Sequence, residues 1–179
     1  HVYRQVLEGI GPYLNPGVAL VSATKGIENE TLMLMGQVAE SVLGGSFTRR
    51  FAPLAGPSFA KEVSRRYPTA VTIASRDLQD ASRLQEIFYT EFFRVYISDD
   101  VTGVQLGGAL KNVIAIAAGA SDGLHLGHNA RAALITRGLA EITRLSVAMG
   151  GKHLTLSGLA GMGDLVLTCT GDLSRNRTV

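Results

Sequence analysis

The stretch FRVYISDDVTGV, residues 93–104, decides the fold, because the hydrophobic pattern changes within it. Before it, short apolar stretches alternate with amphipathic ones, a pattern typical of strands and helices in an α/β layer. After Asp99-Asp100 only helical spacing continues. We therefore predict an α/β fold in which a mostly parallel sheet, residues 1–99, is followed by an all-helical domain, residues 100–179.

Hydrophobic periodicity and turn residues predict the individual elements. Leu78, Ala81, Leu84, Ile87 and Phe88 share one stripe, which we expect to face inward. In the first part we expect strands at 18–23, 50–54, 69–74 and 93–97, and helices at 2–14, 30–43, 58–65 and 77–89. In the second part we expect helices at 101–120, at 130–149 and from about 164.

Composition excludes several classes of protein. The chain has 179 residues, 46% of them hydrophobic, which is enough for a substantial core, and a net charge of only +2. Its arginine pairs are too sparse for a nucleic-acid site. The longest apolar run, residues 113–120, is far short of a membrane span. A single cysteine fits a reducing compartment, so we expect a cytoplasmic protein. The oligomeric state stays open, a homodimer included.

Lys111 is the first candidate catalytic residue. At helical spacing it has Gly107 and Gly108 one turn before it and two apolar residues one turn after. Glycines allow a ligand or another backbone to approach closely, and a lysine shielded from water has a lowered pKa that suits a base. The alternative is a lysine that extends its ammonium group to solvent.

Three further segments carry polar groups at useful spacing. Ser58 is positioned to cap a short helix, which would offer an anion site or be a simple turn. Asp164 and Thr168 fall on one helical face, although an acid at a helix start is common. Ser174-Arg175-Asn176-Arg177 would suit a phosphate group, or would be a solvated loop. His125 and His128 lack partners at metal-ligand spacing, so we expect no metal site and assign both to a loop.

Six segments, which together cover essentially the whole chain, are ATKGIE at 23–28, LAGPSFA at 54–60, GGALKNV at 107–113, NARAAL at 129–134, GMGDL at 161–165 and SRN at 174–176. In this order they resemble the bacterial-type NAD(P)-dependent glycerol-3-phosphate dehydrogenases. The resemblance implies that residues 1–99 are the C-terminal part of a Rossmann-like dinucleotide-binding domain. It also implies that residues 100–179 are the N-terminal part of an all-helical substrate domain.

The resemblance implies a role for each matching position. Lys111 corresponds to the proton acceptor for the substrate hydroxyl, and Lys25, Asp164 and Thr168 to its catalytic companions. Substrate, a small phosphorylated molecule, would be held by Lys25, Gly56, Ser58, Lys111, Asp164, Ser174, Arg175 and Asn176. The cofactor, NAD or NADP, would contact Lys25, Ala60 and Arg175. Which of these two cofactors is preferred stays open.

One family motif is missing. The glycine-rich G-x-G-x-x-G turn that holds the cofactor pyrophosphate lies upstream of the ATK segment in this family, and no such motif occurs here. We therefore expect this chain to be an interior piece of such an enzyme, inactive by itself. The remaining alternatives are a related reductase of another hydroxy acid and a non-catalytic anion-binding module.

Overall fold

The computed structural model describes residues 2–15, 17–171, 173–174 and 176. A four-stranded sheet with the order β1-β2-β3-β4 forms its first part. The strands are β1 (Leu20–Ser22), β2 (Phe51–Ala55), β3 (Thr69–Ala74) and β4 (Phe93–Ser98).

Two of the three strand pairings are parallel, as predicted, and one is antiparallel. β1 pairs with β2 and β3 with β4 in parallel, whereas β2 and β3 run antiparallel, with Leu54 opposite Ile73. The link between β2 and β3 holds only the short helix α3 (Ala60–Ser64), whereas parallel strands are usually joined by a crossover that contains a longer helix. The sheet is therefore mixed at its centre.

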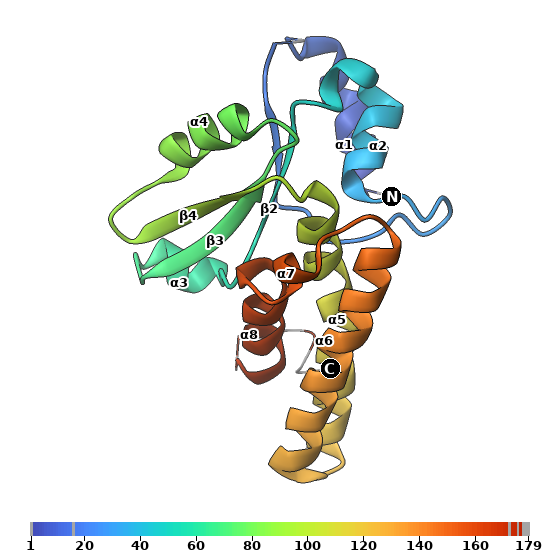
Figure 1. Ribbon diagram of the computed structural model, residues 1–179, viewed down its shortest axis with the longest axis vertical. Helices are drawn as coiled ribbons and strands as arrows, with labels where there is room; N and C mark the ends of the chain where they lie inside the picture. Colours follow the sequence, from blue (N-terminus) through green and yellow to red (C-terminus); the bar gives the residue numbers. More distant parts are fainter. Residues whose placement is uncertain (1, 16, 172, 175, 177–179) are drawn as a thin grey trace.

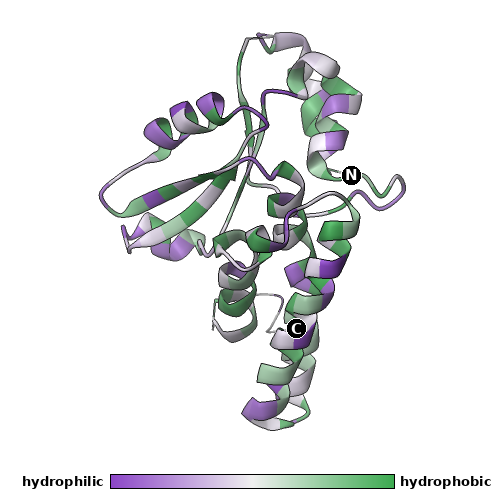
Figure 2. Ribbon diagram, viewed as in Figure 1, coloured by the Kyte–Doolittle hydropathy of each residue, from purple (hydrophilic) through white to green (hydrophobic). Residues whose placement is uncertain are grey.

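Helices cover the sheet at separate places (Figure 1). α1 (Val2–Ile10) packs on α2 (Met35–Leu43) at one end, and α4 (Leu78–Phe88) packs on β3 and β4. Hydrophobic residues run along the strands, whereas α4 is mostly hydrophilic (Figure 2). The sheet core consists of Ala52, Val71, Ile73, Leu84 and Val95.

The second part is helical. α5 (Val101–Gly123) and α6 (Gly127–Ala148) form a long pair that extends away from the sheet (Figure 1). They are followed by α7 (His153–Leu156), a single π-helical turn η3 (Leu159–Gly163), and α8 (Asp164–Thr170). A buried cluster joins these elements: Ala115, Ala118, Ile142, Leu156, Leu165 and Cys169.

A second cluster joins the sheet to the helices. Its four members are buried against one another: Ala55 at the end of β2, Ala74 at the end of β3, Val104 on α5 and Ala160 on η3. Because all four side chains are small or compact, the backbones of strands and helices approach closely there. This junction brings the end of β2 next to the middle of α5 and the start of α8.

A partly buried ion pair fixes the loop that follows β1. Arg4 on α1 donates to both carboxylate oxygens of Glu28, at 2.9 and 2.7 Å, and Thr31 donates to the same carboxylate. These hydrogen bonds lower the pKa of Glu28 to about 2, with the bonds from Arg4 contributing most. The loop that carries Lys25 is thereby attached to α1.

Several element boundaries differ from the sequence prediction. α1 ends at Ile10, and a 3₁₀ turn, η1 (Gly11–Tyr13), replaces its predicted last turn, since Pro12 cannot continue the α-helical hydrogen bonds. α2 begins at Met35 rather than at residue 30, because the Gln37 side chain accepts from the Leu34 N–H and starts the helix there. Neither α7 nor η3 was predicted.

Three predicted residue placements are wrong. Ser58 does not cap α3: the N-cap is Phe59, and the Ser58 hydroxyl donates to the Gly56 carbonyl oxygen at 3.1 Å. On α4, Leu78, Ile87 and Phe88 are exposed and only Ala81 and Leu84 are buried, because β3 and β4 cover a narrow stripe of that helix. His128 lies in the first turn of α6, not in a loop.

One helix in the described part of the chain, α5, is long and apolar enough to cross a membrane by length and composition. Half of its most apolar window is buried inside the protein, against α6, α8 and β2 among other elements. A buried core helix satisfies the same criterion.

Candidate active site

The carboxylate of Asp164 is the centre of a charged cluster formed by three distant segments. Its side chain is 2% exposed, and each of its two oxygens accepts from one lysine. Lys25 donates to Oδ2 at 2.7 Å, and Lys111 donates to Oδ1. The cluster therefore places two cations on one buried anion.

The fold explains how these residues meet. Lys25 follows β1, at the edge where open α/β sheets bind ligands, and Lys111 lies in the middle of α5. Asp164 is the first residue of α8, and Thr168 lies one turn later on the same face. The Thr168 hydroxyl donates to the Asp164 carbonyl oxygen at 2.6 Å and accepts from Lys111 Nζ at 2.8 Å. Thr168 therefore orients the Lys111 amine.

The surroundings of Lys111 lower its pKa to about 8. Burial of the ammonium group is the largest cause, and the nearby Lys25 cation acts in the same direction. The negative charge of Asp164 opposes both. Desolvation therefore outweighs the charge of Asp164, and both the free amine and the ammonium form of Lys111 are accessible near neutral pH.

The two glycines before Lys111 make room for protein atoms. A side chain at Gly107 would collide with the backbone carbonyl of Ala160 in η3. At Gly108 a Cβ atom would lie 3.3 Å from Cγ of Lys25. The sequence allowed either a ligand or another backbone to approach these glycines. At Gly107 it is another backbone, that of η3, that approaches. At Gly108 the neighbour is the second lysine of the cluster.

Gly56 carries a conformation that only glycine adopts readily. Its φ is +145°, and a Cβ atom there would lie 2.9 Å from the Val71 Cα on β3. Its carbonyl oxygen accepts from Ser58 and, at 3.5 Å, from Lys25 Nζ. Gly56 and Ser58 therefore border the lysine cluster.

An open pocket of about 520 Å³ adjoins Lys111. Among the described residues its lining comprises Phe59, Ala60, Lys61, Lys111, Asn112, Thr168, Leu173, Ser174 and Asn176. Ala60, Lys111, Thr168, Ser174 and Asn176 were predicted as site residues, and the structure brings them together here. Lys25, Gly56, Ser58 and Asp164 lie behind or beside the pocket rather than among these lining residues. The predicted site residue Arg175 lies outside the described residues.

Four lining residues were not predicted as site residues, and two of them, Asn112 and Lys61, have polar side chains. Asn112 follows Lys111 directly and accepts from the Asn176 amide at 2.8 Å, which joins α5 to the segment after α8. Its place in the GGALKN segment was a signal that could have identified it. Lys61 follows Ala60 in the LAGPSFAK segment, from which Gly56, Ser58 and Ala60 were predicted as site residues.

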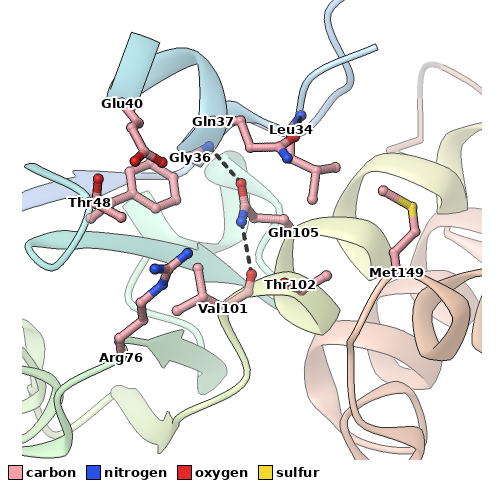
Figure 3. A pocket seen from close by; sticks show the side chains of 11 residues that line it. Leu34, Gly36, Gln37, Glu40, Thr48, Arg76, Val101, Thr102, Gln105 and Met149 are labelled. Atoms are coloured by element: carbon pink, nitrogen blue, oxygen red, sulfur yellow. Dashed lines mark hydrogen bonds between the residues drawn. The ribbon is translucent and has the colours of Figure 1, made fainter. Parts of the chain in front are cut away.

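A second cavity of about 100 Å³ lies between α2 and the start of α5, away from the lysine cluster. Gln105 spans it: its side-chain oxygen accepts from the Gly36 N–H at 2.7 Å, and its amide donates to the Val101 carbonyl oxygen at 2.9 Å (Figure 3). None of the predicted site residues that the structure describes lines this cavity. The bond between Gly36 and Gln105 joins α2 to α5.

Other reactive side chains in the described residues have ordinary structural positions. Burial raises the pKa of the Cys169 thiol to about 11, so it stays protonated and is a poor nucleophile. Residues 2–15, 17–171, 173–174 and 176 contain no group of three His, Cys, Asp or Glu side chains that could hold a metal ion.

Comparison with known families agrees with this arrangement. Residues 1–81 match the family described as NAD-dependent glycerol-3-phosphate dehydrogenase N-terminus, and residues 100–179 match the C-terminus of the same family. A glycerol-3-phosphate dehydrogenase [NAD(P)+] from Geobacter metallireducens is 63% identical over 99% of this chain and 53% of its own length. The corresponding protein of Geobacter sulfurreducens is 64% identical, with the same shares covered.

Solved structures support the fold. The crystal structure of glycerol-3-phosphate dehydrogenase from Coxiella burnetii superimposes with a TM-score of 0.91 at 46% identity, covering 98% of this chain and 53% of that one. The sheet is therefore part of a Rossmann-like α/β fold, and a helical region follows it. The chain spans about half the length of the curated relatives that it matches.

Proposed function

Because this chain belongs to the NAD-dependent glycerol-3-phosphate dehydrogenase family, we propose that the protein containing it interconverts sn-glycerol 3-phosphate and dihydroxyacetone phosphate with NAD or NADP. The supporting observation is the cluster of Lys25, Lys111, Asp164 and Thr168 beside a pocket rich in hydrogen-bond donors.

Lys111 carries the proton transfer in this proposal. During oxidation, the substrate's secondary hydroxyl gives its proton to the free amine of Lys111, and the C–O bond becomes a carbonyl as hydride leaves the carbon. In the reverse direction the ammonium form returns that proton to the carbonyl oxygen. A pKa of about 8 makes both forms available near neutral pH, as a general acid–base group requires.

The companions of Lys111 hold it in place. Thr168 accepts one of its hydrogen bonds and Asp164 another, so the position of Nζ is fixed. Asp164 also stabilises the ammonium form after proton transfer, and Lys25 limits that stabilisation by sharing the carboxylate. Substrate contacts from Lys25, Gly56, Ser58, Ser174, Arg175 and Asn176 belong to the same proposal.

We assign Ala60, which lines the same pocket as Lys111, to the contact with the nicotinamide cofactor. Lys25 and Arg175 are the other residues that we assign to the cofactor. The bound cofactor supplies the hydride acceptor or donor. The residues that hold its pyrophosphate would lie in a glycine-rich turn that this sequence does not contain.

The experiment uses a protein of full family length that contains this chain. Purified enzyme is mixed with dihydroxyacetone phosphate and reduced cofactor, and the loss of nicotinamide absorbance is followed. Turnover with this substrate but not with carboxylated hydroxy acids or their keto forms supports the proposal. Preference for a carboxylated substrate would favour a related reductase, and binding of phosphate without turnover would favour a non-catalytic module.

We also infer a cytoplasmic location, which fits the single buried cysteine. A homodimer is a proposal that light scattering of the purified protein tests directly.

A further inference from the structure

We propose that Lys61 is a further substrate-binding residue, which holds the phosphate group while Lys111 acts on the hydroxyl. This inference rests on the proposed function and deepens it, since it assigns part of the specificity for phosphorylated substrates to a side chain of α3.

Packing at the start of α3 sets the position of Lys61. The ring of Phe59 lies against Gly171 at the end of α8, so closely that a Cβ atom there would come within 2.7 Å of a ring carbon. This contact holds the beginning of α3 against the end of α8. Lys61, two residues after Phe59, therefore lines the same pocket as Lys111 and Asn176.

Lys61 is an available cation in this pocket. Its side chain is exposed and makes no ion pair within the described part of the chain. Lys111, the other lysine of the lining, is already bonded to Asp164 and Thr168. An ammonium group on a flexible stem can reach a bound anion without disturbing that cluster.

The rest of the lining also favours an anion. Amide and hydroxyl groups of the lining come from Asn112, Thr168, Ser174 and Asn176. No carboxylate belongs to the described residues of the lining. The Lys25–Asp164–Lys111 cluster has a net charge of +1 when both lysines are protonated. A phosphate monoester carries about −1.5 to −2 at neutral pH, so a second positive charge completes the match.

The test compares three variants of a full-length enzyme that contains this chain. Lys61→Gln removes the charge, and Lys61→Arg keeps it. Arg65→Gln is the matched control, because it removes a charge from the end of the same helix at a residue that does not line the pocket. For each variant we measure kcat and KM for glycerol 3-phosphate, KM for the cofactor, and inhibition by inorganic phosphate.

Lys61→Gln is expected to raise KM for glycerol 3-phosphate and Ki for inorganic phosphate by about ten-fold, the loss of one charge-assisted contact, with kcat nearly unchanged. Lys61→Arg should restore most of the affinity, and Arg65→Gln should stay near wild type. Oxidation of unphosphorylated glycerol should be equally slow in wild type and Lys61→Gln.

Unchanged KM and Ki in Lys61→Gln would overturn the inference alone, as would an equal effect of Arg65→Gln. A rise confined to KM for the cofactor would instead assign Lys61 to the cofactor and would also overturn it. A wild-type enzyme that does not oxidise glycerol 3-phosphate would overturn the proposed function, and this inference with it.

Discussion

Replacing Asp164 with Asn removes the carboxylate at the centre of the lysine cluster and is expected to destabilise the fold by about 3–5 kcal/mol at pH 7 if Lys111 keeps its proton. Two ammonium groups would then face a neutral amide in a site where Lys111 is 7% exposed. Removing one partner of a buried pair typically costs about this much, because the remaining charge is left uncompensated.

The alternative response of the protein has a smaller cost. The variant can avoid the unpaired charge if Lys111 releases its proton on folding. Because burial already lowers the pKa of Lys111 to about 8 in the wild type, complete release at pH 7 costs roughly 1.4 kcal/mol more than in the wild type, at about 1.36 kcal/mol for each pH unit. The loss at pH 7 therefore lies between about 1.4 and 5 kcal/mol, and the response with the lower cost sets it.

The second response also predicts the pH dependence. When a lysine has a lower pKa in the folded state than in the unfolded state, the unfolded state binds more protons, so stability rises with pH between the two values. In the wild type this rise begins near pH 8, the pKa of Lys111. Without Asp164 the folded-state pKa falls further, so the rise begins at a lower pH.

Denaturant unfolding of wild type and Asp164→Asn at pH 6, 7, 8 and 9 measures both effects. The difference in unfolding free energy should be largest at pH 6 and shrink by up to about 1.4 kcal/mol for each pH unit below pH 8. Asp122→Asn is the control, since the Asp122–Arg131 pair at 2.9 Å is partly exposed and should matter by about 1 kcal/mol or less. A loss below about 1 kcal/mol at every pH for Asp164→Asn would refute the reasoning.

Four further predictions follow from the same contacts. Lys111→Met should lower turnover in steady-state assays by at least about a hundred-fold, since a general base contributes roughly 10²–10⁴-fold. The affinity for the cofactor should stay nearly unchanged. Turnover near the wild-type rate from pH 6 to 10 would contradict the role of Lys111. Lys25→Met should weaken ligand binding. It should also shift the pH–rate profile for oxidation to higher pH, because removing this cation raises the pKa of Lys111 above about 8. An unshifted profile would mean that the two lysines do not interact. Gly107→Ala should destabilise the protein by about 1–3 kcal/mol in thermal unfolding, because the added methyl group overpacks against η3. Gly123→Ala is the control and should leave the stability unchanged, because no atom lies within 4 Å of its added Cβ. The ionised Glu28 carboxylate stabilises the fold fully above about pH 4.5, and this stabilisation is lost as the pH falls toward 2. Glu28→Gln should remove it, so the acid unfolding curves of variant and wild type should converge at low pH.

Local patterns predicted those elements whose sequence signal lies within the element. The strand at 69–74 was predicted with its observed bounds, because TAVTIA combines β-branched residues with clear breaks on either side. α2 was predicted about five residues too long, since residues 30–34 carry helical spacing but are held by the Ile27–Leu34 bridge and the left-handed conformation at Leu32. η3 has a glycine-rich sequence without periodicity, and its shape follows from packing on Gly107.

The active-site geometry could be predicted only in part. Spacing alone indicated that Asp164 and Thr168 share a face, and this is confirmed by the bond from Thr168 to the Asp164 carbonyl oxygen. The bonds that define the cluster join residues 139 and 53 positions apart, between Lys25 and Asp164 and between Lys111 and Asp164. No local pattern carries that information. Only the resemblance to a family indicated that these residues belong to one site. Their catalytic and binding roles stay predictions, as does the division into two domains between residues 99 and 100.

The need for two lysines on one carboxylate follows from the balance of effects on Lys111. If Asp164 served Lys111 alone, its full charge would favour the ammonium form and oppose release of a free amine. If Asp164 were absent, the ammonium formed after proton transfer would be buried without a counter-charge. Sharing the carboxylate with Lys25 gives an intermediate state, in which desolvation still lowers the pKa to about 8 and the protonated form remains paired. Gly108 is part of this arrangement, because the Lys25 stem lies only 3.3 Å from the place of a Cβ atom at that position.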